Sequence, residues 1–448
     1  MEDKLRELGN AALLLRNRPF SRTPFPFPAE YTGWPDEQRA WRDSATLYDQ
    51  SHIMMDVYFE GPDVKRLFSD FGVNSFTTFG KNRAKQYVAC NPDGMVIGDA
   101  VLFGLEDNLY NLVGNADGHV SKWLMYQIET GGYRVTATVD PASPRLSDRQ
   151  VFRYQMNGPL TQRIIEKAAG GPIDPIPFFR IGDLTIAGHS VHALNHSMSR
   201  VPGMEFSGLE LYGPAGGGIA VWEALVAAGE EFGLRLGGAR SYPTSAAESG
   251  WIARPVSAIY SGESMRPYRE WLPSTDLQAS PSMQGSFISD DIADYYATPW
   301  ALGYGRFIKY DHEFVGREAL QRLEAAPKRK KVWLRWDEDD ILRVMRDSLF
   351  GAEAQRPRII DVPMGYRNYH FDKVVDNHGA LVGLSMYLVY TVNIGGFVSM
   401  AMVDEASAIE GTELTVVWGQ EDGGASNSFT VPHVQTTLRA TVSTRPPA

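Results

Sequence analysis

Residues 204–251 constrain the fold of this chain more than any other segment. A strand-like run with Glu205 and Glu210 leads into a glycine-rich turn, and an amphipathic helix and a second turn follow. This order predicts a strand packed against a helix, as in domains that combine both kinds of element. The second turn carries three side chains suited to binding: Arg240, Tyr242 and Trp251.

Glu210 is the candidate ligand-binding carboxylate of this segment. In strand geometry it shares a face with Gly208 and Tyr212, so a flat ligand has room beside Gly208. A carboxylate accepts two parallel N–H bonds, the pattern that the amino-pyrimidine edge of a pterin offers. Trp251 adds a stacking plane, and Tyr242 adds a neutral O–H donor. The alternative is a helix-packed strand whose acids face solvent, and the segment alone leaves both interpretations open.

Length, charge and cysteine content narrow the class of protein. A chain of 448 residues is long enough for two or three domains with sizeable cores. The net charge of -11 argues against a general nucleic-acid binder, which needs a basic surface. The single cysteine, Cys90, excludes an internal disulfide framework and a multi-thiolate metal site. The charged N-terminus lacks the apolar core of a signal peptide, so we expect a cytoplasmic enzyme.

Local patterns predict further elements. A hairpin turns at residues 91–94, and residues 119–130 and 313–325 form helices. The uncharged stretch 381–403 is long enough to cross a bilayer, but its polar residues and glycines divide it into two strands joined by a turn. The basic run 327–331 indicates a solvated linker, and the strands and turns beyond it predict a separate all-β domain.

Two motifs resemble binding sites but lack the required chemistry. The glycine-rich run 213–220 has no Lys-Ser/Thr ending for a phosphate and no acid placed for a dinucleotide, which favours a turn into a helix. His189, His192 and His196 suggest a zinc site, yet the first two point to opposite faces of a strand, and no acid or thiol lies between Asp183 and Glu205. We therefore expect structural or substrate-facing histidines and no metal.

A family resemblance extends over nearly the whole chain, about residues 30–435. It rests on the ordered segments LYDQSHIMMDVYFEGPDV, KQYVACNPDGMVIGDAVLF, NLVGNA, SGLEL, GGAR and TPWALGYGRFIKYDHEFVGREAL. Together they resemble the glycine-cleavage T-protein (aminomethyltransferase) family. Within it, YTGWPDEQRAWRDSATLYDQSH and SYPTSAAESGWI look most like the tetrahydrofolate-dependent O-demethylases of lignin-derived methoxybenzoates.

The resemblance implies an α+β fold with ferredoxin-like subdomains and a C-terminal β-barrel. Residues 1–326 would form the folate-binding body, built of two interleaved α+β subdomains. Residues 327–448 would form the β-barrel domain.

The resemblance also implies roles for individual residues. Glu210 matches the family's pterin-binding glutamate, Trp251 the position where the demethylase branch stacks the cofactor, and Tyr242 the essential tyrosine of that branch. Three more positions match residues that line the folate pocket: Tyr87, Asn115 and Arg240. Four positions fall near the aromatic substrate: Tyr31, Gln50, His52 and Ser286.

Two departures from the family pattern bear on the substrate. Amine-processing members carry two adjacent aspartates after a valine–isoleucine pair, and the first serves their chemistry, whereas this chain has Gly98 and Asp99 there. In vanillate-type enzymes an arginine near the position of Asn115 grips the substrate carboxylate, but residues 107–121 contain no arginine. An amine substrate is therefore disfavoured, and the group that binds the substrate's anion stays unidentified.

The implied chemistry is displacement at a methyl carbon by N5 of tetrahydrofolate, with a phenolate as the leaving group. A phenolate leaves poorly unless its oxygen is hydrogen-bonded or protonated as the C–O bond breaks. Tyr242, whose reference pKa of about 10 keeps it protonated at neutral pH, is the expected donor.

We expect an aryl O-demethylase that binds a small methoxylated aromatic acid and tetrahydrofolate, as a monomer or small homo-oligomer. No nucleic-acid or membrane partner is expected. The alternatives are another folate-linked transferase, acting on an amine or a sulfonium compound, and a non-catalytic folate-binding protein.

Overall fold

The computed structural model describes most of the chain, in the following ranges: 1–16, 27–115, 118–197, 208–253, 255–279, 283–326, 328–364, 369–424 and 430–447. For residues 8, 115 and 369 it describes the backbone alone. The chain folds into two compact units. Unit 1 comprises residues 1–23, 88–98 and 250–447, and unit 2 comprises residues 24–87 and 99–249.

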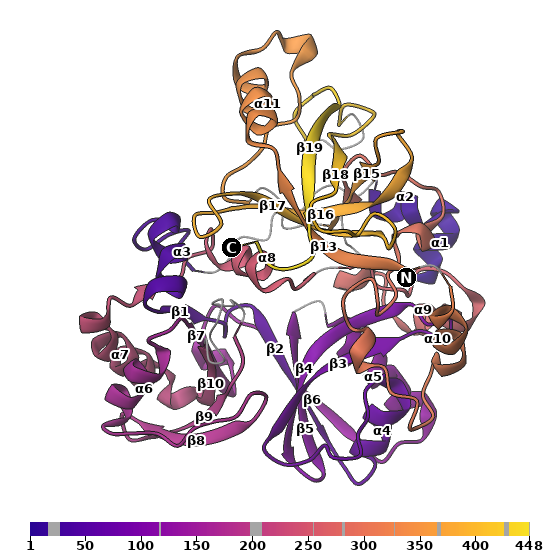
Figure 1. Cartoon of the computed structure of the whole chain (residues 1–448). Coiled ribbons are helices and arrows are strands. Elements are labelled where there is room, and N and C mark those ends of the chain that lie inside the picture. The colour runs from indigo at the N-terminus through magenta and orange to yellow at the C-terminus, as the bar shows by residue number, and fades with distance from the viewer. Residues whose placement is uncertain are drawn as a thin grey trace. The chain divides into compact units, whose positions relative to one another are not determined.

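The first sheet of unit 2 has six strands: β1 (Thr46–Asp49), β7 (Val151–Asn157), β8 (Ile181–Ile186), β9 (His189–Leu194), β10 (Gly208–Pro214) and β11 (Arg235–Leu236). They lie in the order β11-β1-β7-β10-β9-β8, and all neighbours are antiparallel except β1 and β11. Three helices accompany them: α3 (Trp34–Asp43), α6 (Thr161–Ala169) and α7 (Gly218–Gly229). Helices α6 and α7 pack side by side against this sheet (Figure 1), where Ile164, Val221 and Leu225 join its apolar core.

A second sheet belongs mostly to unit 2 and has five strands: β2 (Met54–Glu60), β3 (Arg83–Cys90), β4 (Val96–Glu106), β5 (Leu109–Asn115) and β6 (Thr136–Asp140). Residues 88–90 of β3 and 96–98 of β4 are assigned to unit 1. Their order is β3-β4-β5-β2-β6. Helix α4 (Val64–Phe71) covers one face, because the Phe68 ring packs against the rings of Tyr87 on β3 and Tyr110 on β5.

Helix α5 (His119–Gly131) lies beside α4, and Phe71 meets Trp123 edge to face across the two helices. The helix ends where the chain turns at Gly132, whose φ of 67° suits glycine. The predicted hairpin at 91–94 and the predicted helix at 119–130 are thus confirmed.

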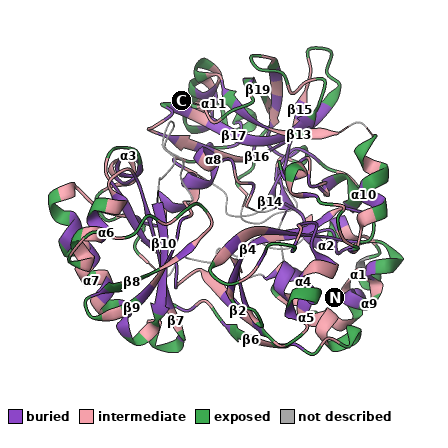
Figure 2. Cartoon of the chain, turned by 60° about the horizontal axis from the view of Figure 1, so that its bottom comes forward, coloured by how far each residue is buried: buried purple, intermediate pink, exposed green. Residues whose placement is uncertain are grey.

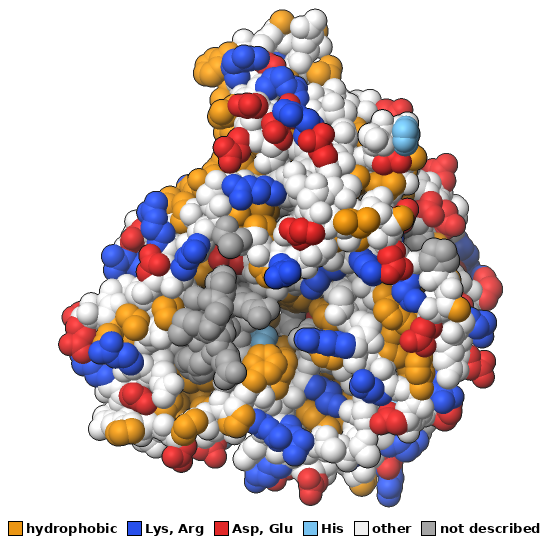
Figure 3. Space-filling model, in the orientation of Figure 1, with side chains coloured by type: hydrophobic (Ala, Val, Ile, Leu, Met, Phe, Trp, Pro, Cys, Tyr) orange, Lys and Arg blue, Asp and Glu red, His pale blue; other side chains and the backbone are white. Residues whose placement is uncertain are grey.

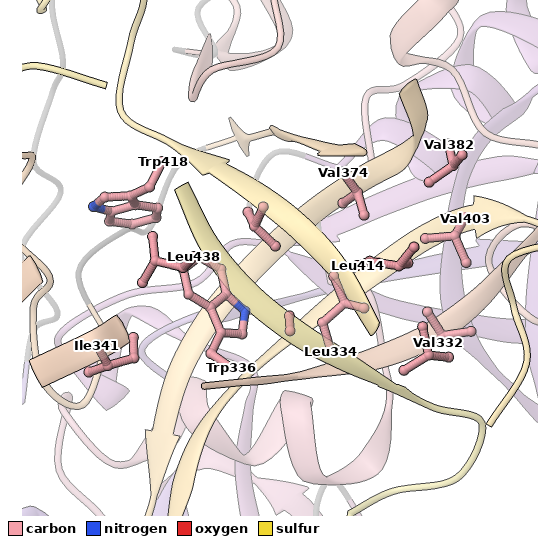
Figure 4. Packing of buried hydrophobic residues seen from close by; sticks show 14 of the residues in the cluster. Val332, Leu334, Trp336, Ile341, Val374, Val382, Val403, Leu414, Trp418 and Leu438 are labelled. Atoms are coloured by element: carbon pink, nitrogen blue, oxygen red, sulfur yellow. The ribbon is translucent and has the colours of Figure 1, made fainter. Parts of the chain in front are cut away.

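Unit 1 contains a closed barrel of six strands: β13 (Arg329–Trp336), β15 (Asp372–Val375), β16 (Leu381–Thr391), β17 (Gly396–Asp404), β18 (Glu413–Trp418) and β19 (Thr436–Ser443). They follow the order β13-β17-β16-β15-β18-β19, and β19 closes on β13. Trp336 and Trp418 meet edge to face inside, with ring centroids 5.6 Å apart, among valines and leucines (Figure 4). The predicted C-terminal barrel and the two strands within 381–403 are confirmed, while a domain boundary between residues 326 and 327 stays a prediction.

Seven further elements of unit 1 are α1 (Glu2–Leu8), α2 (Ala11–Arg16), α9 (Arg266–Trp271), α10 (Arg317–Glu324), α11 (Glu338–Phe350), β12 (Met283–Gln284) and β14 (Tyr369–His370). Helix α10 confirms the helix predicted at 313–325. Unit 2 also contains the short α8 (Ser245–Ser249).

The linker predicted at 327–331 is wrong, because β13 begins at Arg329. Arg329 lies opposite Asp404 of β17, with Nε 3.5 Å from the carboxylate. The Nζ of Lys330 lies 2.5 Å from Oε1 of Glu405. Opposite charges on neighbouring strands stabilise their pairing, so this basic run is part of a sheet.

Charged side chains of both signs are interspersed over the face shown in Figure 3. Over the described part of the chain, no helix combines the length and apolar character that crossing a membrane requires.

Candidate functional site

A cluster of five charged side chains lies buried inside unit 2, and their relative exposures are 0 to 5%. They are Asp56, Asp140, Arg149, Arg153 and Glu210. Strands β7 and β10, which carry Arg153 and Glu210, are buried along nearly their whole length (Figure 2). Charges removed from water in this way persist only when they are paired and hydrogen-bonded.

Arg153 is the centre of this cluster. Its guanidinium donates to both carboxylate oxygens of Asp56 on β2 and to Oε1 of Glu210 on β10. The guanidinium carbon also lies 4.9 Å from the ring centroid of Tyr212 and 5.1 Å from that of Phe103. Since Asp56 and Arg153 belong to different sheets, these charge-assisted bonds tie the two sheets together.

Arg149 is the second cation of the cluster. Its Nη2 donates to Asp56 at 2.6 Å and lies 3.3 Å from Oδ2 of Asp140. Three carboxylates thus face two guanidinium groups, and both guanidinium groups bind Asp56. The cluster has an excess of negative charge, which favours N–H donors or a cation beside it.

Glu210 is held in its ionised form. Burial would raise the pKa of its carboxyl group, but Arg153 and His196 outweigh burial, and the pKa lies below the usual 4.5. The Nδ1 of His196 is 3.5 Å from Oε2 of Glu210, too far for a strong hydrogen bond. Oε2 is therefore the oxygen with capacity to accept from a ligand.

Two amide side chains adjoin Glu210 on the same sheet. Gln155 lies directly opposite Glu210 in the β7–β10 register. Its Nε2 donates to Oδ1 of Asn157 at 3.0 Å and to the carbonyl of His196 at 2.9 Å. Oε1 of Gln155 and Nδ2 of Asn157 are buried without a hydrogen-bond partner among the described residues. Because buried polar atoms are seldom left unpaired, these atoms fit a ligand edge that presents both donors and acceptors.

The predicted space for a ligand beside Gly208 is wrong. A Cβ at this position would lie 2.4 Å from the carbonyl oxygen of Met156 and 2.9 Å from Oδ1 of Asn157. Glycine is required there because strand β7 approaches closely. Glu205 lies outside the described residues.

A second group of side chains surrounds Tyr242, which begins the short helix η4 (Tyr242–Thr244). Nε2 of Gln50 donates to the Tyr242 hydroxyl oxygen at 3.2 Å, a bond that does not use the hydroxyl proton. The rings of Tyr48 and Phe27 meet Tyr242 edge to face, with centroids 5.0 and 6.5 Å away. Phe27 also lies 6.2 Å from the ring of His52. The structure thus brings Gln50, His52 and Tyr242 into one neighbourhood.

The surroundings keep the Tyr242 hydroxyl protonated. Burial raises its pKa, the Gln50 bond acts in the opposite direction, and the charge of Glu210 raises it further. His52 differs: burial lowers its pKa, but the Asp49 carboxylate 2.8 Å away and the Ser143 carbonyl leave the pKa raised. The group therefore holds a neutral phenol and a histidine that protonates readily.

Arg240 and Tyr31 lie on two loops of unit 2. The guanidinium of Arg240 pairs with Glu30 and lies 5.8 Å from the ring centroid of Trp34. The side chain of Tyr31 is 43% exposed, and its backbone N–H donates to Oε1 of Glu37 at 2.6 Å. Their roles in cofactor and substrate binding stay predictions.

Four other predicted residues have different surroundings. Tyr87 is fully buried beneath α4, and its hydroxyl donates to a backbone carbonyl of that helix at 3.1 Å. Asn115 ends β5, and its side chain lies outside the described atoms. Trp251 and Ser286 belong to unit 1, where Trp251 is half-buried and the Ser286 hydroxyl donates to the carbonyl of Val417 at 2.7 Å. Their predicted roles are also untested.

Three polar residues of β7 were not predicted as site residues, although the sequence pattern around them was informative: Arg153, Gln155 and Asn157. In the run RQVFRYQMN these polar residues alternate with Phe152, Tyr154 and Met156. Such alternation is typical of a strand with one face in solvent, whereas here both faces are buried. Burial on both faces is what turns a polar stripe into a candidate site.

The glycine-rich run 213–220 is a turn into a helix, as predicted: η2 (Ala215–Gly217) leads directly into α7. His192 lies 2.6 Å from Asp183 through Nδ1. Within the described ranges, no group of three or more His, Cys, Asp and Glu residues is placed to hold a metal ion.

Comparison with known proteins finds a matching family model and similar proteins over most of the chain. Residues 19–255 match the family model of the GCVT N-terminal domain. The chain is 38% identical to syringate O-demethylase from Sphingobium sp., over 100% of this chain and 95% of that protein. It is 27% identical to sesamin methylene transferase from Sinomonas sp., over 88% and 86% of the two chains.

More distant similarity reaches the aminomethyltransferases. The protein of that name from Caldanaerobacter subterraneus is 26% identical over 68% of this chain and 70% of its own length. The crystal structure of the glycine cleavage system aminomethyltransferase T from Bartonella henselae superposes with a TM-score of 0.63 at 17% identity, covering 99% and 97% of the two chains. This structural likeness confirms the predicted fold.

Proposed function

Because the chain belongs to the GCVT family of glycine-cleavage T-proteins, we propose that it is a cytoplasmic tetrahydrofolate-dependent aryl O-demethylase. It transfers a methyl group from a methoxylated aromatic acid to N5 of tetrahydrofolate, and the products are a phenol and 5-methyltetrahydrofolate. Tetrahydrofolate, when bound, supplies the nucleophilic nitrogen. Methoxybenzoates such as vanillate, syringate or a chlorinated analogue are the proposed substrates.

The observation that carries this proposal is the buried, protonated hydroxyl of Tyr242, bonded to Gln50 within an aromatic cluster. As the aryl ether C–O bond breaks, negative charge develops on the oxygen, and a neutral O–H donor stabilises it. The 38% identity with syringate O-demethylase, which extends over 100% of this chain, supports the same reaction class. Gly98, where amine-processing members carry their aspartate, argues against an aminomethyl donor.

We further propose that Glu210, Gln155 and Asn157 hold the pterin edge of tetrahydrofolate. Oε2 of Glu210 and Oε1 of Gln155 would accept its N–H groups, and Nδ2 of Asn157 would donate to an acceptor. The support is the pair of buried amide atoms that have no hydrogen-bond partner in the described part of the chain, beside an ionised carboxylate.

Product analysis tests the proposed reaction. The purified protein is incubated with tetrahydrofolate and syringate, vanillate or a chlorinated methoxybenzoate. We expect equal amounts of 5-methyltetrahydrofolate and the corresponding phenol. Release of ammonia from an aminomethyl donor, or binding of folate without methyl transfer from any methoxybenzoate, would overturn the proposal.

The substitution Glu210→Gln tests the pterin assignment. One acceptor becomes an N–H donor that faces ligand N–H groups, and lost charged hydrogen bonds typically cost about 1.5–3 kcal/mol. The Kd for tetrahydrofolate, measured by calorimetry, should therefore rise roughly 10- to 100-fold. Glu223→Gln, on the exposed face of α7, serves as a matched control and should leave the Kd unchanged. An unchanged Kd in a folded Glu210→Gln variant would remove Glu210 from the site.

A further inference from the structure

Helix α3 turns a polar face toward the segment that carries Tyr242. Gln38, on this buried face, donates through Nε2 to Oγ1 of Thr244 at 3.0 Å. One turn later, Nε1 of Trp41 donates to Oε2 of Glu248 at 2.7 Å. These contacts join residues more than 200 positions apart in the sequence.

Glu37 is the fully buried carboxylate on this face of α3, with 0% exposure. Oε1 accepts the backbone N–H groups of Tyr31 at 2.6 Å and Thr32 at 3.3 Å. Oε2 accepts the N–H of Gly238 at 2.8 Å and the hydroxyl of Ser241 at 2.6 Å. All four donors are neutral, so the carboxylate is stabilised by hydrogen bonds to two separate loops.

The two loops joined by Glu37 carry Tyr31 and Tyr242. They also pair directly, since the N–H groups of Ala239 and Arg240 donate to the carbonyls of residues 28 and 29 at 2.9 and 3.0 Å. A Cβ at Gly238 would lie 2.4 Å from the carbonyl oxygen of residue 29, so only glycine permits this approach. The N–H of Tyr242 donates to the Gly238 carbonyl at 3.0 Å, which links the Glu37 contacts to the Tyr242 backbone.

We propose that Glu37 is a positioning residue for methyl transfer: its carboxylate clamps the loop at 31–32 to the loop at 238–241 and so fixes the Tyr242 hydroxyl for the leaving oxygen. This inference rests on the proposed function. The negative charge of Glu37 also favours the neutral form of a neighbouring phenol. Burial, Asp49 and Glu37 all raise the pKa of Tyr31.

The substitution Glu37→Gln tests the clamp. Glutamine keeps the size of the side chain, but its N–H₂ group would face N–H and O–H donors of the two loops instead of accepting from them. The loops at 31–32 and 238–241 should therefore separate. We expect kcat to fall roughly 10- to 100-fold, because small displacements of a reacting group are costly. The Kd for tetrahydrofolate should change much less than kcat, since the proposed pterin contacts lie on β7 and β10. Glu248→Gln also removes a buried carboxylate bonded to α3, and it should leave kcat unchanged.

A double-mutant cycle separates positioning from general destabilisation. If Glu37 acts through Tyr242, the added substitution Glu37→Gln should cause a further loss of kcat of less than about twofold in the Tyr242→Phe variant. Additive losses, or full kcat in folded Glu37→Gln, would overturn the proposal. Should Glu37→Gln fail to fold, Ser241→Ala removes one of the four donors and should give a smaller loss with the same non-additivity.

Hydrogen exchange tests the clamp independently of methyl transfer. If the wild-type protein transferred no methyl group, that result would count against the proposed function but not against the clamp. The amides of Tyr31, Thr32 and Gly238 should exchange faster in Glu37→Gln than in the wild type or in Glu248→Gln. Equal exchange in all three proteins would overturn the clamp itself.

Discussion

Replacement of Tyr242 by phenylalanine should lower kcat roughly 10²- to 10⁴-fold, the usual contribution of a positioned proton donor. The hydroxyl would stabilise charge that exists only as the aryl C–O bond breaks. For that reason kcat and kcat/KM should fall together, while the Kd values of folate and substrate barely change. Loss of the Gln50 bond should reduce stability by about 1 kcal/mol, too little to unfold the protein. Single-turnover and steady-state kinetics measure the effect.

The defect of Tyr242→Phe should also depend on the leaving group. Ring chlorines stabilise the departing phenolate, so chlorinated methoxybenzoates should need the donor less than electron-rich dimethoxy substrates. Tyr154→Phe is the matched control, because it also removes a buried tyrosine hydroxyl, which donates to the Gly218 carbonyl at 2.8 Å. An equal loss across the substrate series would make Tyr242 a positioning residue, and full activity would leave it with a structural role only.

Replacement of Arg153 by methionine should destabilise the protein by about 3–5 kcal/mol, the range found when one partner of a buried ion pair is removed. Asp56 would keep only Arg149 as its cation, and Glu210 would lose its direct ion pair with a guanidinium. Urea denaturation at pH 7 measures the change in the free energy of unfolding. Arg134→Met removes an ion pair of a side chain that is 74% exposed, and it should leave stability nearly unchanged.

The Arg153→Met defect should shrink in acid. Burial opposes ionisation of Asp56 and Glu210, but the neighbouring cations leave the pKa of both carboxyl groups lowered. Carboxylates with lowered pKa stabilise the native state above their unfolded pKa, and this stabilisation is lost as the pH falls through the folded pKa. Without Arg153 both groups should protonate at higher pH, which relieves the buried charge. A loss below about 1 kcal/mol, or one equal at pH 7 and pH 4.5, would contradict the role of Arg153 in this cluster.

The sequence alone determined features that depend on near neighbours in the chain. Helix α5 follows from its apolar spacing and the glycines that end it, and the β3–β4 hairpin follows from its turn residues. The two strands within 381–403 follow from polar residues and glycines that interrupt an apolar stretch. The family, and with it the barrel, was recognisable because its motifs occur in order along the chain. Glu210 and Tyr242 could be singled out on the same basis.

Only the tertiary structure decided which charges meet. Asp56 and Arg153 are 97 residues apart, and Glu37 and Ser241 are 204 apart. No local pattern predicts such pairs, because side chains far apart in sequence meet only once the sheets and loops have packed. The basic run at the start of β13 looked like a linker until Asp404 and Glu405 were found beside it. Likewise, Gly208 looked like space for a ligand, whereas the backbone of β7 fills that space. The free energy of burying a charge depends on the partners that surround it, and those partners are supplied by the folded chain.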